Sequence, residues 1–243
     1  MTNGAVGKSE TAIVVGVGPG LGLALVRACH VAGMNVIAVA RKPDKVKNLI
    51  VELGSSVKVI ACDATREEQV KDLFQQTANW FGSPSLVVFN AGAFVPKGIL
   101  NTDTEEFERC WRVGCLGGFL VGREAASAML NAPSSSGNTI IFTGATASLR
   151  GSARFHNLAV GKFGLRALAQ SMARELGPRG IHVAHVIIDG QIRAERDGYR
   201  EQERGEEAVL HPDAIANNYL ILHRQPRNAW THELDMRPWV EKF

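Results

Sequence analysis

The sequence predicts an α/β protein with a single domain, in which a doubly wound parallel sheet of about seven strands carries helices on both faces. The chain has 243 residues, a length that suits one large domain. Short β-branched runs alternate with longer helical patterns, as in βαβ units. The runs are nearly continuous in Val, Ile and Phe, which is typical of strands covered by helices on both sides.

Six runs account for the strands, and each precedes a helical stretch or a loop leading into one. In chain order they are TAIVVG, NVIAVAR, SVKVIACD, SLVVFN, NTIIFTG and IHVAHVIID. Right-handed crossovers between parallel strands leave few topologies. In such sheets ligands bind in the crevice beyond the carboxyl ends of the strands, so we expect the site at that edge.

Three helices stand out between these runs. The first, LGLALVRACHVAG, ends at Gly33, and its apolar stripe indicates packing against the core. A second, long helix is expected over 104–130, and a third over 157–177, where Gly and Pro follow. The stripe of the first helix consists of Leu21, Leu25, Ala28 and Ala32.

Composition excludes several classes of protein. Apolar residues make up 45% and charged residues 21%, which suits a compact soluble chain, and a net charge of +3 is too small to indicate nucleic-acid binding. No apolar run reaches the roughly 20 residues of a membrane helix, and the polar start MTNGAVGKSE is unlike a secretory signal. Four cysteines without a CxxC pair are expected to be small buried side chains in a reducing cytoplasm, and scattered histidines give no metal site. The cysteines are Cys29, Cys62, Cys110 and Cys115.

One strongly charged stretch, AERDGYREQERGEEAV, covers 194–209. Its simplest interpretation is a solvated helix face or a mobile loop. The functional alternative is a lid over a pocket, which makes 190–212 a candidate loop on the substrate side of the domain.

A glycine-rich turn follows the first strand and opens the first helix. Glycines allow a tight turn and let backbone N–H groups approach a pyrophosphate at a helix N-terminus. The strict GxGxxG string is absent because its sixth position is Leu21, but GxxxGxG is present on Gly16, Gly20 and Gly22.

With this spacing the chain resembles the short-chain dehydrogenase/reductase family, which implies a Rossmann-like fold, a dinucleotide cofactor and a small-molecule substrate. The likeness extends along most of the chain. Asp63 in CDAT resembles the aspartate beside adenine, residues 90–92 match the NAG motif, and Lys162 stands where the lysine of YxxxK belongs.

The tip of the second strand decides between the two nicotinamide dinucleotides. An acidic residue there would bond both ribose hydroxyls, whereas Arg41, with Lys42 and Lys45 nearby, offers positive charge to a 2′-phosphate. NADP(H) is therefore the expected cofactor; the alternative is that Arg41 is a solvated residue at a strand end. The expected cofactor contacts are Gly16, Gly18, Gly20, Leu21, Gly22, Arg41, Lys42, Asp63, Ala64, Asn90, Ala91, Gly92, Lys162 and Ile192.

The resemblance breaks at the catalytic positions. The place of the family's tyrosine, four residues before Lys162, holds Leu158, and neither Tyr199 nor Tyr219 has a lysine four residues later. The family's serine corresponds to Ala145, and its helix asparagine to Gly114. Lys162 is the one member of the set that remains.

The loop after the sixth strand also departs from the family, because Asp189 and Gly190 stand where its proline and glycine are expected. Ile192 remains able to offer its backbone to the nicotinamide carboxamide.

Four nearby side chains are candidates for other tasks at this site. His156 is a candidate general acid, although a lone histidine at a helix start is more often a surface residue. Thr146 offers a hydroxyl displaced by one residue, and Arg154 offers positive charge to orient an anion. Asn157 is expected to cap the helix that starts there.

Two functions follow. The favoured one is an NADP(H)-dependent reductase that moves hydride to a carbonyl, an imine or another activated acceptor without a tyrosine acid. The alternative is a dinucleotide-binding homologue whose redox chemistry is lost or replaced. The two long helices resemble those through which family members pair, and the C-terminal AWTHELDMRPWVEKF has apolar residues to bury, so a homodimer or homotetramer is expected.

Overall fold

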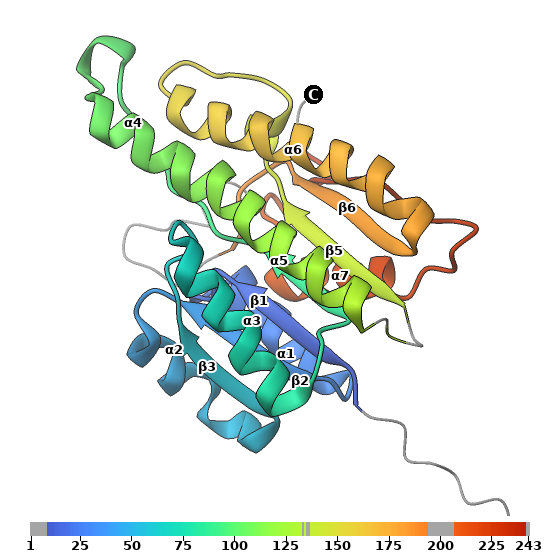
Figure 1. Ribbon diagram of the computed structural model, residues 1–243. Coiled ribbons are helices and arrows are strands. Elements are labelled where there is room, and N and C mark those ends of the chain that lie inside the picture. The colour runs from blue at the N-terminus through green and yellow to red at the C-terminus, as the bar shows by residue number, and fades with distance from the viewer. Residues whose placement is uncertain (1–8, 133, 135–136, 194–206, 242–243) are drawn as a thin grey trace, which may run out of the picture.

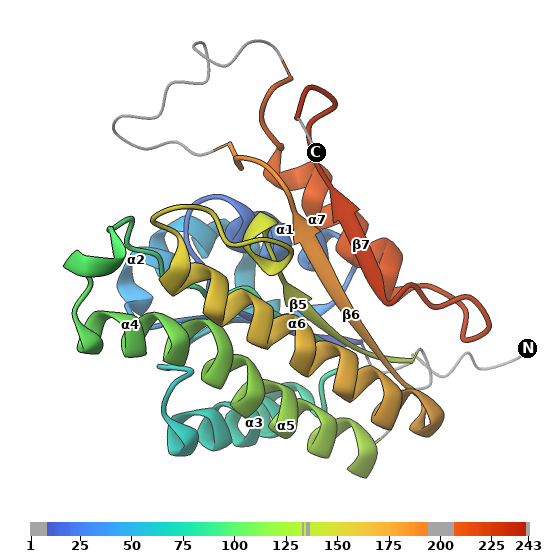
Figure 2. The ribbon, with the colours of Figure 1, turned by 90° about the horizontal axis from the view of Figure 1, so that it is seen from above.

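A computed structural model describes residues 9–132, 134, 137–193 and 207–241 (Figure 1). Its described residues form a parallel sheet of seven strands in the order β3-β2-β1-β4-β5-β6-β7, with helices on both faces (Figures 1 and 2). This confirms the predicted fold class. The strands are β1 (Thr11–Val15), β2 (Asn35–Ala40), β3 (Val57–Ala61), β4 (Leu86–Phe89), β5 (Asn138–Thr143), β6 (Ile181–Ile188) and β7 (Glu233–Met236).

Two apolar layers sandwich the sheet, and alternate residues of each strand enter different layers. In β1, Ala12 and Val14 face α1, α2 and α7, whereas Ile13 and Val15 face α3, α5 and α6. Both sets are fully or almost fully buried, which explains why the strand run is apolar at every position. The helices are α1 (Leu21–Val31), α2 (Pro43–Ile50), α3 (Glu67–Phe81), α4 (Thr104–Trp111), α5 (Gly117–Asn131), α6 (His156–Leu176) and α7 (Pro212–His223).

The long helix expected over 104–130 consists of α4 and α5 joined by a π-helical turn at Arg112–Leu116. Its full stretch, Thr104–Asn131, is long and apolar enough to cross a membrane by length and composition alone, and half of its most apolar window is buried within the protein. Core helices pass the same test. Cys115, in the π turn, is only partly buried, so the expectation of a buried side chain is wrong for this one of the four cysteines.

The seventh strand, β7, lies in the C-terminal segment AWTHELDMRPWVEKF, for which the sequence predicts only that apolar residues are buried. Glu233–Met236 pairs in parallel with β6, and His185 donates its backbone N–H to the His232 carbonyl at 2.8 Å. This strand shows no apolar run, because two of its four residues are acidic and none of the four is fully buried.

The predicted lid is described only at its two ends, because residues 194–206 lie outside the described ranges. The ends are joined: Arg193 donates its backbone N–H to Leu210 at 2.8 Å, and Leu210 donates to Gln191 at 2.9 Å. Ile192 is thereby fixed in a short bridge opposite Leu210.

Candidate functional site

The glycine turn connects β1 to α1 at the carboxyl edge of the sheet. Gly16 has a φ of 93°, and a Cβ added there would lie 2.6 Å from the backbone nitrogen of Ala91. The side-chain amide of Asn90 donates to the Gly16 carbonyl at 3.1 Å. Glycine is therefore required at position 16, because the turn lies directly against the backbone that follows β4.

A cavity of about 620 Å³ opens beside this turn, over the carboxyl ends of β1, β2 and β4. It is open above Gly18, where an added Cβ would meet no atom within 4 Å. Most of the predicted cofactor residues line it: Gly16, Gly18, Arg41, Lys42, Asp63, Ala64, Asn90, Ala91 and Gly92. Gly20, Leu21, Gly22, Lys162 and Ile192 are not part of its lining.

Several lining residues were missed by the sequence reasoning. Val46 and Leu49 on α2 and Val113 in the π turn contribute apolar walls, and Thr65 lies beside Asp63. The only signal for Val46, Leu49 and Val113 in the sequence is an apolar helix face, which equally predicts core packing. The sequence gives no signal for Thr65.

The charge of the cavity is concentrated at the tip of β2. Arg41, Lys42 and Lys45 line the cavity and are exposed. Among the described lining residues the only carboxylate is Asp63, whose Oδ1 accepts from the backbone N–H and the hydroxyl of Thr65 at 3.0 and 2.8 Å. Asp63 therefore holds the turn after β3, and the basic cluster faces the cavity without a carboxylate partner at its own end.

Lys162 lies deeper, behind the chain segment that follows β4. Its side chain is buried, and its Nζ donates to the Thr143 carbonyl at 2.6 Å. A Cβ added at Gly92, which lines the cavity, would lie 3.8 Å from that Nζ. Burial lowers the pKa of Lys162 to about 8, because the charged form is poorly solvated there.

Leu158 lies one helical turn before Lys162 on α6 and is partly exposed. Tyr219 is placed elsewhere: it is fully buried between α7 and the other face of the sheet, where its hydroxyl shares a 2.9 Å hydrogen bond with Thr143 Oγ1. Burial raises its pKa. Tyr199 lies outside the described residues.

The Thr146 hydroxyl, proposed above as a substitute, is already engaged. It donates to Asp189 Oδ1 at the end of β6, and Arg237 contacts Asp189 Oδ2 at 3.1 Å. Asp189, where a proline was expected, is therefore a buried ionic anchor for the turn after β5. Gly114 packs against α6, and a Cβ added there would lie 3.6 Å from the Gly161 Cα.

The first turn of α6 corrects one prediction. Asn157 does not cap the helix, which begins at His156 with Phe155 at the cap position; it is fully buried, and its side-chain amide donates to the Val95 carbonyl at 2.7 Å. His156 is half-buried, and its Nε2 shares a 2.9 Å hydrogen bond with Thr102. Arg154 donates to the Pro96 carbonyl at 3.3 Å.

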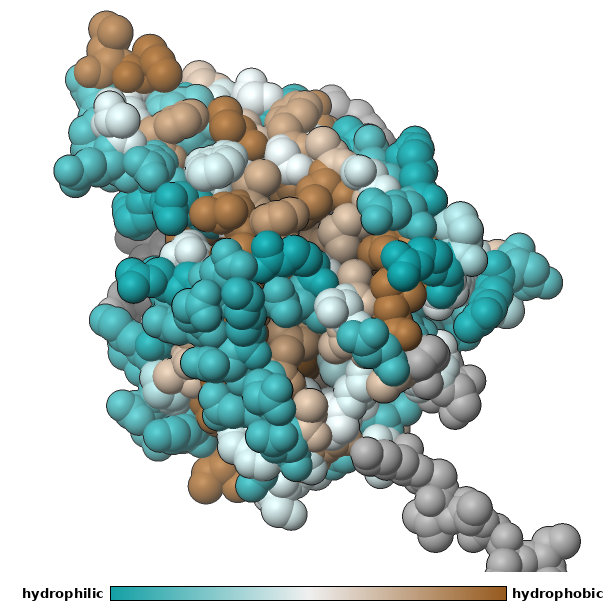
Figure 3. Space-filling view, viewed as in Figure 1, coloured by the Kyte–Doolittle hydropathy of each residue, from teal (hydrophilic) through white to brown (hydrophobic). Residues whose placement is uncertain are grey.

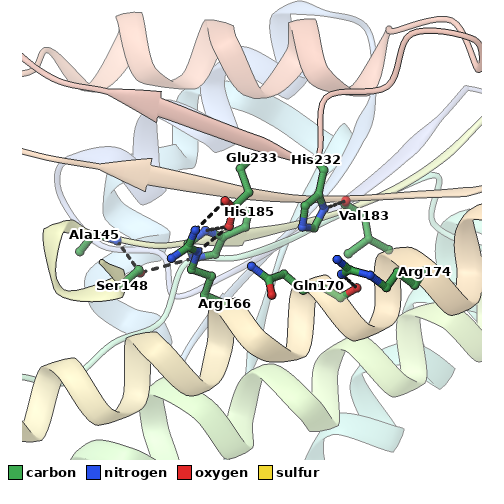
Figure 4. A network of polar contacts seen from close by, with 9 residues as sticks. All are labelled: Ala145, Ser148, Arg166, Gln170, Arg174, Val183, His185, His232 and Glu233. Carbon is green, nitrogen blue, oxygen red and sulfur yellow. Dashed lines mark hydrogen bonds and ion pairs between the residues drawn. The ribbon is translucent and has the colours of Figure 1, made fainter. Parts of the chain in front are cut away.

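A partly buried polar network connects the turn after β5 with α6, β6 and β7 (Figure 4). Arg166 of α6 makes two hydrogen bonds to Glu233 of β7, at 2.6 and 2.8 Å, and these hold the pKa of Glu233 below its usual range. His185 lies between Glu233, 3.8 Å from its Nδ1, and Ser148, 3.4 Å from its Nε2. Ser148 in turn accepts the backbone N–H of Ala145 at 3.2 Å.

This network fixes the turn in which Ala145 and Thr146 lie. Burial lowers the pKa of His185 to about 4, so its ring is neutral at physiological pH. A Cβ added at Gly144 would lie 2.5 Å from that ring, so the turn has no room for a side chain at this position. The sequence gives no signal for the network, since its members come from four separate segments.

Comparisons with known proteins agree with this architecture. The profile of the family described as short chain dehydrogenase matches residues 10–203. An uncharacterised oxidoreductase of Staphylococcus aureus is 27% identical over 238 residues, covering 94% of this chain and 97% of that protein. The crystal structure of a short-chain dehydrogenase from Rhodopseudomonas palustris is 36% identical, with a TM-score of 0.79, covering 95% of this chain and 99% of that one.

A metagenomic short-chain oxidoreductase solved in complex with NADP shares the fold, with a TM-score of 0.81 at 24% identity over 96% of this chain and 99% of that one. The chain belongs to the short-chain dehydrogenase family. It is an oxidoreductase of that family.

Proposed function

We propose that this protein is an NADP(H)-dependent reductase that transfers hydride to a small-molecule carbonyl, imine or other activated acceptor without a tyrosine acid. The observation that carries the proposal is the basic tip of β2, where Arg41, Lys42 and Lys45 line the cavity beside the glycine turn. An acidic residue at this tip would favour NAD instead.

The residues of the cavity fit a phosphorylated dinucleotide. Its volume of about 620 Å³ lies within the range of small-molecule sites, roughly 300–1,000 Å³. The turn at Gly18 leaves backbone room for a pyrophosphate at the start of α1, and Arg41 would bind the 2′-phosphate. The bound NADP of the metagenomic relative is consistent with this choice.

When bound, a reduced nicotinamide supplies the hydride. Lys162 would hold a ribose hydroxyl, because its ammonium lies just behind Gly92 on the cavity wall. Leu158, one helical turn before Lys162 on α6, has no group that can donate a proton. General acids are typically worth about 10² to 10⁴ in rate, so a ketone, whose oxygen must take up a proton, is a poor substrate here. A cationic iminium needs no such proton after hydride addition.

The non-redox alternative is favoured by one observation: the two candidate substitutes for the missing acid are both engaged. Thr146 donates its hydroxyl to Asp189, and the His156 ring is bound to Thr102. In that alternative the protein binds NADP(H) but transfers hydride to no acceptor.

The first test is cofactor choice. Calorimetric titration should give tighter binding of NADPH than of NADH, because a charge-assisted contact to the 2′-phosphate contributes about 1.5–3 kcal/mol. Arg41→Asp should invert the preference. Equal affinities for both cofactors, unchanged by Arg41→Asp, would refute the assignment.

The second test compares acceptors. Loss of NADPH absorbance should be faster with a cyclic iminium than with a ketone of similar shape. The triple variant Leu158→Tyr, Ala145→Ser and Gly114→Asn should regain part of the ketone activity, because Lys162 lies one helical turn from position 158. Tight NADPH binding with no transfer to either acceptor would support the non-redox alternative.

A further inference from the structure

Two loops meet beside the site through an aromatic pair. Phe94 follows the Asn90–Gly92 segment after β4, and Phe155 immediately precedes α6. Their ring centroids are 4.5 Å apart at an interplanar angle of 36°. Both rings remain accessible, with 40% and 38% of the residue surface exposed. Each ring therefore covers part of the apolar surface of the other, and the rest of both rings remains exposed.

The aromatic pair is continuous with the buried lysine. Phe155, Leu158 and Lys162 are spaced by three and four residues, which places them along one side of α6. On the opposite loop, Gly92 lies against the Lys162 Nζ, and Phe94 follows two residues later. An apolar surface thus begins at Lys162 and extends outward along both loops. We call it the apolar wall; it consists of Phe94, Phe155 and Leu158.

Two hydrogen bonds between the segments that carry Phe94 and Phe155 fix the apolar wall. Asn157, fully buried, donates to the Val95 carbonyl at 2.7 Å, and Arg154 donates to the Pro96 carbonyl at 3.3 Å. These contacts fasten the loop after β4 to the start of α6. A binding surface fixed before its ligand arrives loses less conformational entropy on binding.

Two of the charged side chains near the wall already have partners. Arg154 is bound to Pro96, and Lys97 pairs with Glu106 at 2.7 Å and contacts Asp103 at 3.9 Å. The wall itself contributes no charge and no hydrogen-bonding side chain. Its accessible aromatic rings favour a flat apolar partner, because aromatic surfaces stack in offset or tilted arrangements and gain from burial.

We infer that the apolar wall is the substrate-recognition surface for a compound with a flat aromatic or conjugated body attached to the reducible group. The inference rests on the proposed reductase function. The wall begins beside Lys162, whose ammonium lies behind Gly92 of the cavity lining, and this makes the substrate of this site the favoured occupant over a second copy of the chain.

The test uses two cyclic imines of similar reactivity: 1-methyl-3,4-dihydroisoquinoline, which has a fused benzene ring, and 2-methyl-1-pyrroline, which has none. With NADPH, kcat/KM should be about tenfold or more higher for the aromatic imine. Phe94→Ala and Phe155→Ala should each reduce kcat/KM for the aromatic imine severalfold, mainly through KM, and change that of the pyrroline less than about twofold. Trp80→Ala, which removes an aromatic ring of 45% exposure from α3, is the matched control and should change neither.

A binding measurement separates this inference from the proposed function. Unreactive isoquinoline should bind the NADP⁺-loaded protein in calorimetry, and Phe155→Ala should weaken it severalfold, whether or not either imine is turned over. Failure of NADPH to bind would refute the proposed function. NADPH binding with isoquinoline affinity that is absent, or unchanged in Phe155→Ala, would overturn the inference alone. A change of oligomeric state in Phe94→Ala, seen by light scattering, would also overturn it, because a second copy would then cover the wall.

Discussion

Lys162 and Arg166 lie one turn apart on α6, and their charges are satisfied in different ways. Arg166 has a carboxylate partner in Glu233, whereas the described partner of the Lys162 ammonium is the Thr143 carbonyl. A dipole compensates less of the desolvation cost than an opposite charge does, and the pKa of Lys162 is accordingly lowered to about 8. The carbonyl therefore compensates the charge of the Lys162 ammonium only in part, as expected of a group that also binds a ligand.

The pH dependence of stability should reveal this. Between pH about 8 and 10.5 the unfolded chain holds a proton on Lys162 that the folded chain has lost, so the free energy of unfolding should rise with pH across that window. The rise should amount to at most about 3 kcal/mol. Urea unfolding of the protein and of Lys162→Met isolates the effect, since other titrating groups cancel in the difference. A difference between the two that is constant from pH 7 to 11 would contradict the assigned pKa.

The sequence predicts which side chains form the site better than it predicts the contacts they make. The spacing of Gly16, Gly20 and Gly22 predicts the turn because backbone geometry restricts it to glycine. Asn157 was misassigned because the helix begins one residue earlier than expected, at His156, and because its partner, the Val95 carbonyl, lies 62 residues away in sequence. Short-range propensity cannot anticipate such a partner.

The strand β7 is held to the rest of the protein by side-chain contacts as well as by its pairing with β6. Glu233 connects it to α6 through Arg166 and approaches His185 of β6 (Figure 4). The six other strands could be predicted from their apolar runs, because all of them except the edge strand β3 are buried along almost their whole length. β7 could not, since two of its four residues are acidic and its Glu233 is explained only by an arginine on a distant helix.

Removal of this connection should destabilise the fold. Glu233→Gln leaves the half-buried Arg166 without its carboxylate, and we expect a loss of about 1–2 kcal/mol in the free energy of unfolding. Asp44→Asn, which breaks an exposed ion pair with Lys47, is the control and should cost less than about 0.5 kcal/mol. Equal losses in the free energy of unfolding, measured with urea, would show that the Glu233–Arg166 contact stabilises the fold no more than an exposed ion pair does.

The outer surface formed by α5 and α6 exposes several large apolar side chains. Figure 3 shows apolar side chains gathered over these helices. Phe119 of α5 and Val160 and Phe163 of α6 are each more than 40% exposed. Large exposed apolar patches mark interaction sites, so we propose that this face pairs two copies of the chain.

Light scattering at micromolar concentration should give a mass at least twice 26.2 kDa. The double variant Phe119→Glu and Phe163→Glu should shift the protein toward 26.2 kDa, because pairing would bury the new charges. Val31→Glu, at an exposed position on α1, should leave the mass unchanged. A single species of 26.2 kDa for the parent protein would reject the assembly.

The first half of α6 is fastened at three levels, through Asn157 to the loop after β4, through Lys162 to β5 and through Arg166 to β7. An opening of this whole half of the helix must break all three contacts, so its amide hydrogens should exchange slowly. Farther along, Arg174 donates to the carbonyl of Gln170 in the same helix, a contact that gives no such attachment. Local opening should therefore become easier toward the C-terminal end of α6, so the part that carries Lys162 keeps its amide protection longest.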